Sequence, residues 1–146
     1  MKAIGMILLT IFLGKSCSNE AQNDINNAVL QYSSHTRGFH LKIIINNQIA
    51  TISKGRTPET MSQTQLKITN ADWKELISLF EKTNLEAFPT LKDPTQKRHY
   101  DGAAIADLKV RYQDKNYETV DFDHGFPPAE IENLVNKIVA LADEKE

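Results

Sequence analysis

The stretch FHLKIIINNQIATISK, residues 39–54, decides the fold of this chain. Its first half, residues 39–46, is rich in β-branched side chains and is typical of a strand. Asn46 and Asn47 indicate a tight turn, and residues 48–54 have the composition of a returning strand. The sequence therefore predicts an antiparallel hairpin here.

A helix is predicted after this hairpin. Residues 55–62, GRTPETMS, indicate a loop, and residues 65–68, QLKI, indicate a short third strand. Thr69 is followed three residues later by Asp72, which is a signal for a helix N-terminus. We expect the helix over residues 70–83. Its apolar face, which we expect in the core, consists of Trp73, Leu76, Ile77 and Phe80.

A second hairpin and a second helix follow. Residues 104–112 alternate apolar and polar side chains, which predicts a strand with one buried face. Residues 113–116, QDKN, indicate a turn, and residues 117–123, YETVDFD, pair back with Val120 and Phe122 on the apolar side. Proline is tolerated in a first helical turn, so a helix is expected to begin near the two prolines that follow. These prolines are Pro127 and Pro128. The apolar face of this helix consists of Ile131, Leu134, Val135, Ile138 and Leu141.

The order hairpin, helix, hairpin, helix predicts an α+β domain. We expect an antiparallel sheet of about four strands with two helices packed on one face, formed by residues 32–146. A chain of 146 residues with 40% hydrophobic residues is sufficient for one core. The formal net charge of −2 provides no basic field, so nucleic acid is not expected as a partner.

The N-terminal region is predicted to lie outside the fold. Lys2 precedes an apolar run over residues 3–14 that is too short to span a bilayer, so residues 1–16 are interpreted as a signal peptide. Residues 17–31 are rich in Asn, Gln, Glu and Asp and indicate a flexible tether, although AVLQY at residues 28–32 is an alternative start of the folded part.

The order of basic start, apolar run, small residue and Cys17 resembles the signal of Gram-negative bacterial lipoproteins. It departs from the usual pattern at Gly14 and Lys15, where that signal has leucine and a small residue. The resemblance implies that Cys17 is acylated and becomes the mature N-terminus, anchored in a membrane of the cell envelope and facing the periplasm or the cell surface. Acyl chains would then hold a domain that is otherwise water-exposed. The alternatives are ordinary cleavage that leaves a free thiol, or an uncleaved anchor.

Catalytic and metal-binding patterns are weak in this chain. It contains no GxSxG, SxxK, GxGxxG or phosphate-loop motif, and we predict neither a cofactor nor a metal. His35 and His40 do not have a metal-site spacing. Asp121, Asp123 and His124 are the candidates for a small hydrolase or metal-dependent enzyme.

A calcium loop is the other interpretation of this segment. Asp121, Asp123 and Glu132 occupy positions 1, 3 and 12 of such a loop, but position 6, which requires glycine, is Phe126. The structural alternative is that these residues end a strand and begin a helix.

Loops of mixed polar and aromatic composition indicate a contact surface instead. Residues 97–102, KRHYDG, concentrate side chains that are common in recognition loops and interface hot spots. The candidate partner-binding residues are Arg37, Arg98, His99, Tyr100, Asp101, His124 and Phe126. The competing interpretation is that loops at hairpin ends are polar by default.

A second resemblance covers residues 36–141. The segments TRGFHLKIII, LEAFP, DGAAIADLKVRY and PPAEIENLVNKI are similar to the layout of emfourin-type small domains and to lipoprotein domains. The matching points are Gly38, Phe39, Pro128, Leu134 and Val135. The resemblance implies this fold and inhibition of a peptidase as one function. We therefore expect a non-enzymatic, lipid-anchored envelope domain that binds another envelope protein, with peptidase inhibition or hydrolase activity as alternatives.

Overall fold

The computed structural model describes residues 25–143. The predicted signal peptide, Cys17 and the first part of the predicted tether lie outside these residues. Within them the chain forms one antiparallel sheet whose strands have the spatial order β4-β3-β2-β1-β5-β6, with β7 also paired to β5. The strands are β1 (Val29–Thr36), β2 (Phe39–Asn46), β3 (Ile49–Gly55), β4 (Ser62–Lys67), β5 (Ile105–Tyr112), β6 (Lys115–Glu118) and β7 (Phe122–Asp123).

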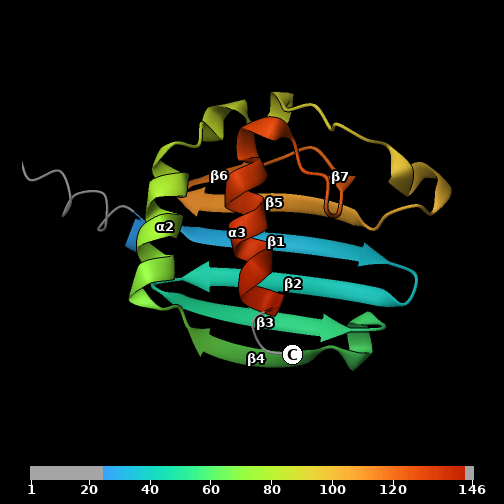
Figure 1. The fold of residues 1–146 in the computed structure, drawn as a ribbon, viewed down its shortest axis with the longest axis horizontal. Coiled ribbons are helices and arrows are strands. Elements are labelled where there is room, and N and C mark those ends of the chain that lie inside the picture. Colours follow the sequence, from blue (N-terminus) through green and yellow to red (C-terminus); the bar gives the residue numbers. More distant parts are fainter. Residues whose placement is uncertain (1–24, 144–146) are drawn as a thin grey trace, which may run out of the picture.

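Helices α2 (Asn70–Glu81) and α3 (Glu132–Asp143) cross the same face of this sheet (Figure 1). The connections between the regular elements contain four short 3₁₀ segments in the described chain. These are η1 (Pro58–Thr60), η2 (Leu85–Thr90), η3 (Lys97–Tyr100) and η4 (Ala129–Ile131). The predicted α+β class, antiparallel pairing and helix-covered face are confirmed. Within residues 25–143, no helix is long and apolar enough to cross a membrane.

The described sheet contains seven strands, more than the predicted number of about four. One of the additional strands results from the division of the predicted strand 117–123 into β6 and β7. Another is β1, which was not predicted and which lies between β2 and β5. Residues 29–31 therefore belong to a strand, so the prediction of a tether reaching residue 31 is wrong at that end. Ile25 and Leu30 are fully or almost fully buried, and this burial explains why the folded part begins earlier.

The first hairpin turns one residue later than predicted. Asn46 pairs with Ile49 across β2 and β3, which leaves Asn47 and Gln48 as the turn. Both have positive φ, at 49° and 65°, as a two-residue hairpin turn requires. The side-chain amide of Gln48 also donates to the Ile68 carbonyl at 2.9 Å, which joins this turn to the end of β4.

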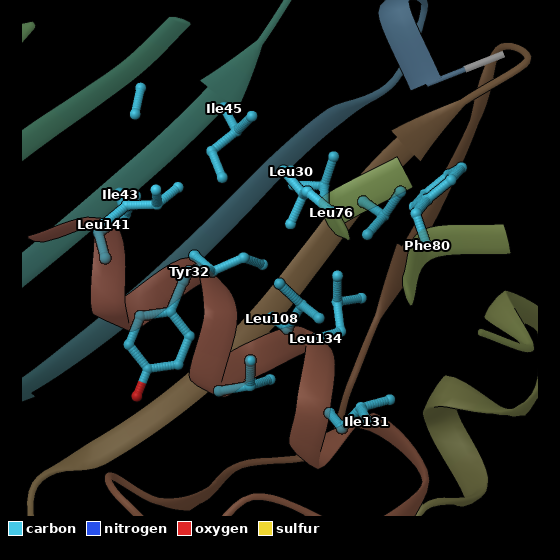
Figure 2. Close-up of a cluster of buried hydrophobic side chains, with 14 of the residues drawn as sticks. Leu30, Tyr32, Ile43, Ile45, Leu76, Phe80, Leu108, Ile131, Leu134 and Leu141 are labelled. Carbon is cyan, nitrogen blue, oxygen red and sulfur yellow. The ribbon is translucent and has the colours of Figure 1, made fainter. Parts of the chain in front are cut away.

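The core lies between the sheet and the two helices (Figure 2). Alternate residues of β1, β2 and β5 point towards the helices, as period-2 side-chain geometry requires. Trp73 is 2% exposed, which confirms its predicted place in the core. The core residues labelled in Figure 2 are Leu30, Tyr32, Ile43, Ile45, Leu76, Phe80, Leu108, Ile131, Leu134 and Leu141.

Polar contacts fix both helices. The Thr69 hydroxyl oxygen accepts from the Asp72 backbone N–H at 3.2 Å, which confirms the predicted start of α2. The Lys137 amine on α3 lies 2.6 Å from carboxylate oxygens of both Asp72 and Glu75 on α2. The Lys54 amine of β3 donates to the Ala142 carbonyl at 2.8 Å and so satisfies a carbonyl in the last turn of α3.

The strand that returns after β5 contains a β-bulge. Lys109 pairs with Glu118 and Ala106 pairs with Phe122, so three residues of the returning strand lie opposite two of β5. This extra residue divides the strand into β6 and β7. It also shifts the alternation, so that buried Thr119 faces the core while Val120 is exposed. The prediction that Val120 lies on the apolar side is therefore wrong, whereas Phe122 is fully buried as expected.

Candidate functional site

The predicted contact residues come from three segments that meet at one end of the sheet. His35 pairs with both His40 and Ile105, and Ile105 pairs with Asp123. The turn after β1, the segment before β5 and the segment after β7 therefore share this end (Figure 1). We call its exposed and half-buried part the sheet-end surface, formed by Arg37, Lys97, His99, Tyr100, Asp101 and Phe126.

Asp123 anchors the segment that carries η3. Its carboxylate is completely buried and accepts from the Thr95 hydroxyl at 2.5 Å, from the backbone N–H of Lys97 at 2.6 Å and from that of Arg98 at 3.1 Å. Burial alone would raise the pKa of Asp123, but these hydrogen bonds outweigh it and lower the pKa to about 2. Asp123 is thus ionised at neutral pH and holds a loop in place.

Arg98 is directed inward rather than towards a partner. Its guanidinium lies 2.8 Å from a carboxylate oxygen of Asp93 and 3.1 Å from one of Asp123, and its side chain is only 12% exposed. Burial alone would lower the pKa of Arg98, but these two carboxylates raise it. Because the five donors of a guanidinium suit such paired acceptors, Arg98 stabilises the loop, and its predicted role as a free contact residue is not supported.

His124 is also turned towards the fold. Its Nδ1 lies 2.6 Å from the hydroxyl of Tyr32, and its ring centre lies 5.5 Å from that of Phe39. Figure 2 shows the Tyr32 hydroxyl pointing away from the apolar cluster. Burial lowers the pKa of His124 and raises that of Tyr32, so both side chains favour their uncharged forms. His124 therefore links the end of β7 to the middle of β1.

The remaining predicted residues are exposed and form a surface of aromatic and cationic character. Tyr100 is 73% exposed and Phe126 is 41% exposed, which are high values for large apolar rings. The Lys97 amine lies 3.9 Å from the centre of the Phe126 ring, a cation–π contact that joins η3 to the segment after β7. Arg37, His99 and Asp101 are exposed as well.

The backbone of the η3 segment closes tightly under Tyr100. Asp101 has a positive φ of 58°, and the Gly102 backbone N–H donates to the Lys97 carbonyl at 2.8 Å. A Cβ at position 102 would lie 3.0 Å from the Tyr100 ring and 3.1 Å from the Lys97 carbonyl oxygen. Glycine therefore allows η3 to turn back on itself and to place Tyr100 at the surface.

The residues of the candidate catalytic cluster do not converge. Asp121 is exposed, Asp123 is bonded to the η3 segment, and His124 is bonded to Tyr32. Glu132, the last residue of the calcium-loop interpretation, is exposed at the start of α3. Among residues 25–143 there is no group of three or more His, Cys, Asp or Glu side chains positioned to hold a metal.

Two shallow hollows lie elsewhere on the described surface. One of about 450 Å³ lies at the turn end of β3 and β4, beside Ile49, Gln65 and Leu66. The other, of about 460 Å³, lies over β5, β6 and the start of β1. Neither of these two hollows includes a residue of the sheet-end surface.

Two roles at this end of the sheet were not predicted from the sequence. Lys97 lies in the predicted contact segment 97–102, but its contact with the Phe126 ring is not predicted from the sequence, and Asp123 is considered there for chemistry rather than for anchoring a loop. Two partners of the Asp123 carboxylate, Thr95 and Arg98, lie 28 and 25 residues away from it in the sequence. Only the concentration of polar and aromatic residues in 97–102 signalled this surface, because local spacing carries no information on contacts between distant segments.

Searches with the whole sequence match no protein-family model and no curated protein. The lipoprotein and emfourin resemblances therefore stay predictions from the sequence.

Proposed function

We propose that this chain is a lipid-anchored protein of the cell envelope whose folded domain binds another envelope protein and does not act as an enzyme. The observation that carries the proposal is the exposure of two large aromatic side chains, Tyr100 and Phe126, at one end of the sheet. Aromatic rings held at a surface are the usual centres of protein interfaces, because their burial by a partner removes much apolar area from water.

The surroundings of these rings favour recognition. Asp123, Thr95 and Arg98 hold the η3 segment through several hydrogen bonds, so little conformational entropy remains to be lost when a partner binds. The Lys97 amine lies over the Phe126 ring, and the cationic Arg37 is exposed at the same end of the sheet. We infer a partner surface that offers carboxylates and an apolar or aromatic pocket.

The positions of Asp121, Asp123 and His124 also favour binding over catalysis. A general base requires a side chain free to reach a substrate. The carboxylate of Asp123 already accepts hydrogen bonds from three residues, and the Nδ1 of His124 is engaged by Tyr32.

The first experiment is mild crosslinking of the tagged, full-length protein in its own membranes, followed by mass spectrometry of the captured proteins. We expect one abundant envelope protein. The variant Tyr100→Ala/Phe126→Ala should lose this partner, with an affinity weakened by roughly tenfold or more, as is usual for hot-spot residues. A metallopeptidase as the partner would agree with the inhibitory function that the emfourin resemblance implies.

Ile49→Ala is the matched control. Ile49 is a similarly exposed apolar residue, at 45%, but it lies at the opposite end of the sheet, next to the turn between β2 and β3. Its loss should leave partner capture unchanged. Repeated preparations without an enriched protein, or equal capture by the double variant and the wild type, would refute the proposed role of the sheet-end surface.

A further inference from the structure

The two edges of the sheet differ. At one edge η2 lies against β6, and the Tyr117 hydroxyl donates to a Glu86 carboxylate oxygen at 3.3 Å. At the other edge, no strand in residues 25–143 pairs with the outer side of β4 (Figure 1). An uncovered edge strand presents unpaired N–H and C=O groups with which another chain can pair, and charges, prolines or bulges are common features that block such pairing. The β4 sequence, SQTQLK, contains no proline or glycine and only one charged residue, Lys67.

The register shows which backbone groups of β4 are free. Because Asn47 and Gln48 form a two-residue turn, Asn46 and Ile49 are a hydrogen-bonded pair, and the backbone groups of alternate β3 residues from Ile49 onward face β2. The intervening β3 residues face β4, in agreement with the bond from the Ile68 N–H to the Gln48 carbonyl at 2.9 Å. The residues of β4 whose N–H and C=O groups point outward are therefore Gln63, Gln65 and Lys67.

We propose that β4 pairs antiparallel with β4 of a second copy of this chain, about a two-fold axis at Gln65. Gln65 would lie opposite Gln65 of the second copy, and Gln63 would lie opposite Lys67 of the second copy. All three outward residues then form hydrogen-bonded pairs, and the two sheets become one continuous sheet across the interface. This contact lies on a different surface from the sheet-end surface and does not depend on the proposed function.

The side chains of β4 are complementary to themselves in this register. No like charges face each other, because Lys67 lies opposite a neutral glutamine. On the helix-covered side, half-buried Leu66 would lie opposite Thr64 of the second copy, which reduces the exposure of Leu66 to water. A shift of the axis to either neighbouring hydrogen-bonded register would leave one outward residue of each copy unpaired. The shallow hollow beside Gln65 and Leu66 gives the side chains of a paired strand room.

Cysteine crosslinking tests the register. Cys17 is the only natural cysteine, so a full-length Cys17→Ser background makes an introduced cysteine the only thiol. Gln65→Cys should form a disulfide-linked dimer at least about tenfold faster than Gln63→Cys, since only position 65 faces itself across the axis within disulfide reach. Mixing Gln63→Cys with Lys67→Cys should produce a linked heterodimer. Equal rates for both single variants, or no linked dimer with either, would overturn the proposal.

Proline at position 65 tests the contact without crosslinking. The Gln65 N–H points outward, so Gln65→Pro removes a donor to the second copy and none to β3. We expect sedimentation equilibrium to show a dimer for the wild type and a monomer for Gln65→Pro, both with the same circular dichroism spectrum. Gln65→Thr keeps the N–H and should remain dimeric.

Two outcomes would contradict pairing between copies. One is a Gln65→Pro variant that is folded and still dimeric. The other is a wild-type protein that stays monomeric while a different protein protects the amides of Gln63 and Gln65 from hydrogen exchange. The second result would assign the β4 edge to that protein instead.

Discussion

At the scale of single residues, Asp123 shows how one buried charge organises a surface that it does not reach. Its carboxylate accepts hydrogen bonds from Thr95, Lys97 and Arg98, and the loop that these residues form carries Tyr100. An ionised group without solvent contact is stable only when its hydrogen-bonding capacity is filled, as it is here. The shape of the sheet-end surface therefore depends on the ionisation of Asp123.

The pH dependence of stability follows from this carboxylate. The pKa of Asp123 is about 2 in the folded chain, below its ordinary value of 3.8. Because the folded-state pKa is the lower one, the ionised group stabilises the fold above about pH 4, and this contribution is lost as the pH falls towards 2. It amounts to about 2 kcal/mol. Asp123→Asn should therefore lower the free energy of unfolding by about 2 to 4 kcal/mol at pH 7.

Urea denaturation between pH 2 and pH 7 measures this effect, and the difference between the variant and the wild type should narrow at the acidic end. Asp101→Asn is the control, because that carboxylate is exposed and asparagine tolerates its positive φ. A difference that is independent of pH would contradict the assigned role of the Asp123 charge.

At the scale of elements, the bulge between β6 and β7 replaces a backbone acceptor by a side chain. The Thr119 N–H donates to the Leu108 carbonyl at 3.0 Å, while the Leu108 N–H donates to the Thr119 hydroxyl oxygen at 3.1 Å. Both residues are buried. The hydroxyl thus satisfies an N–H that the extra residue would otherwise leave without a partner in the ladder.

Thr119→Val removes this acceptor and keeps the shape of the side chain. Because the Leu108 N–H would then be buried without a partner, we expect a loss of about 1 to 3 kcal/mol in the free energy of unfolding. The amide of Leu108 should also exchange faster with deuterium in NMR experiments. Val120→Thr, the same exchange in reverse at the adjacent exposed position, should change stability by less than about 0.5 kcal/mol. Equal effects of the two variants would argue against the hydrogen bond.

The elements that the sequence predicts well are those in which apolar residues recur at one constant spacing along the whole element. Residues 39–46 form β2 as predicted, and α2 and α3 bury the expected apolar faces. Strand β1 was missed because Ser33, Ser34 and His35 make its second half polar, although backbone pairing with β2 on one side and β5 on the other holds it in the sheet. Val120 was assigned to the wrong face of the strand, because the alternation of apolar and polar residues in the sequence does not reveal a β-bulge.

The candidate site was predictable only as a loop of suitable composition. Tyr100 and Phe126 are exposed, as a contact surface requires. Arg98 and His124 are turned inward towards Asp123 and Tyr32. The sequence did not indicate this direction, because these partners lie 25 and 92 residues away in the sequence. Contacts of that length depend on the register of the whole sheet, which composition and local spacing do not determine.

At the scale of the whole molecule, the described fold has a helix-covered face and an open face of the sheet. The expected attachment point, Cys17, precedes β1 by twelve residues, since β1 begins at Val29. If Cys17 carries acyl chains, the membrane holds the domain through a short segment that leads into the middle of the sheet.

Cys17→Ala tests this anchoring. We expect the variant to move from the detergent phase to the aqueous phase in phase partitioning, because acyl chains on this residue would provide the membrane affinity. Metabolic labelling with a palmitate analogue should mark the wild type and not the variant. Lys15→Ala, which leaves the cysteine in place, is the control and should remain in the detergent phase. Unchanged partitioning of Cys17→Ala would refute acylation at this position.

The central position of β1 has a consequence for the order in which the chain folds. Strands β1 to β4 are consecutive neighbours, so each can pair with the one made just before it. The other side of β1 must wait for β5, whose Val110 pairs with Leu30 across eighty residues of sequence. Closing so long a loop is slow, and contacts of this kind limit folding rates. A four-stranded meander of β1 to β4 should therefore form first. The side of β1 that pairs with β5 should stay unpaired until the last third of the chain, which contains β5, has been added.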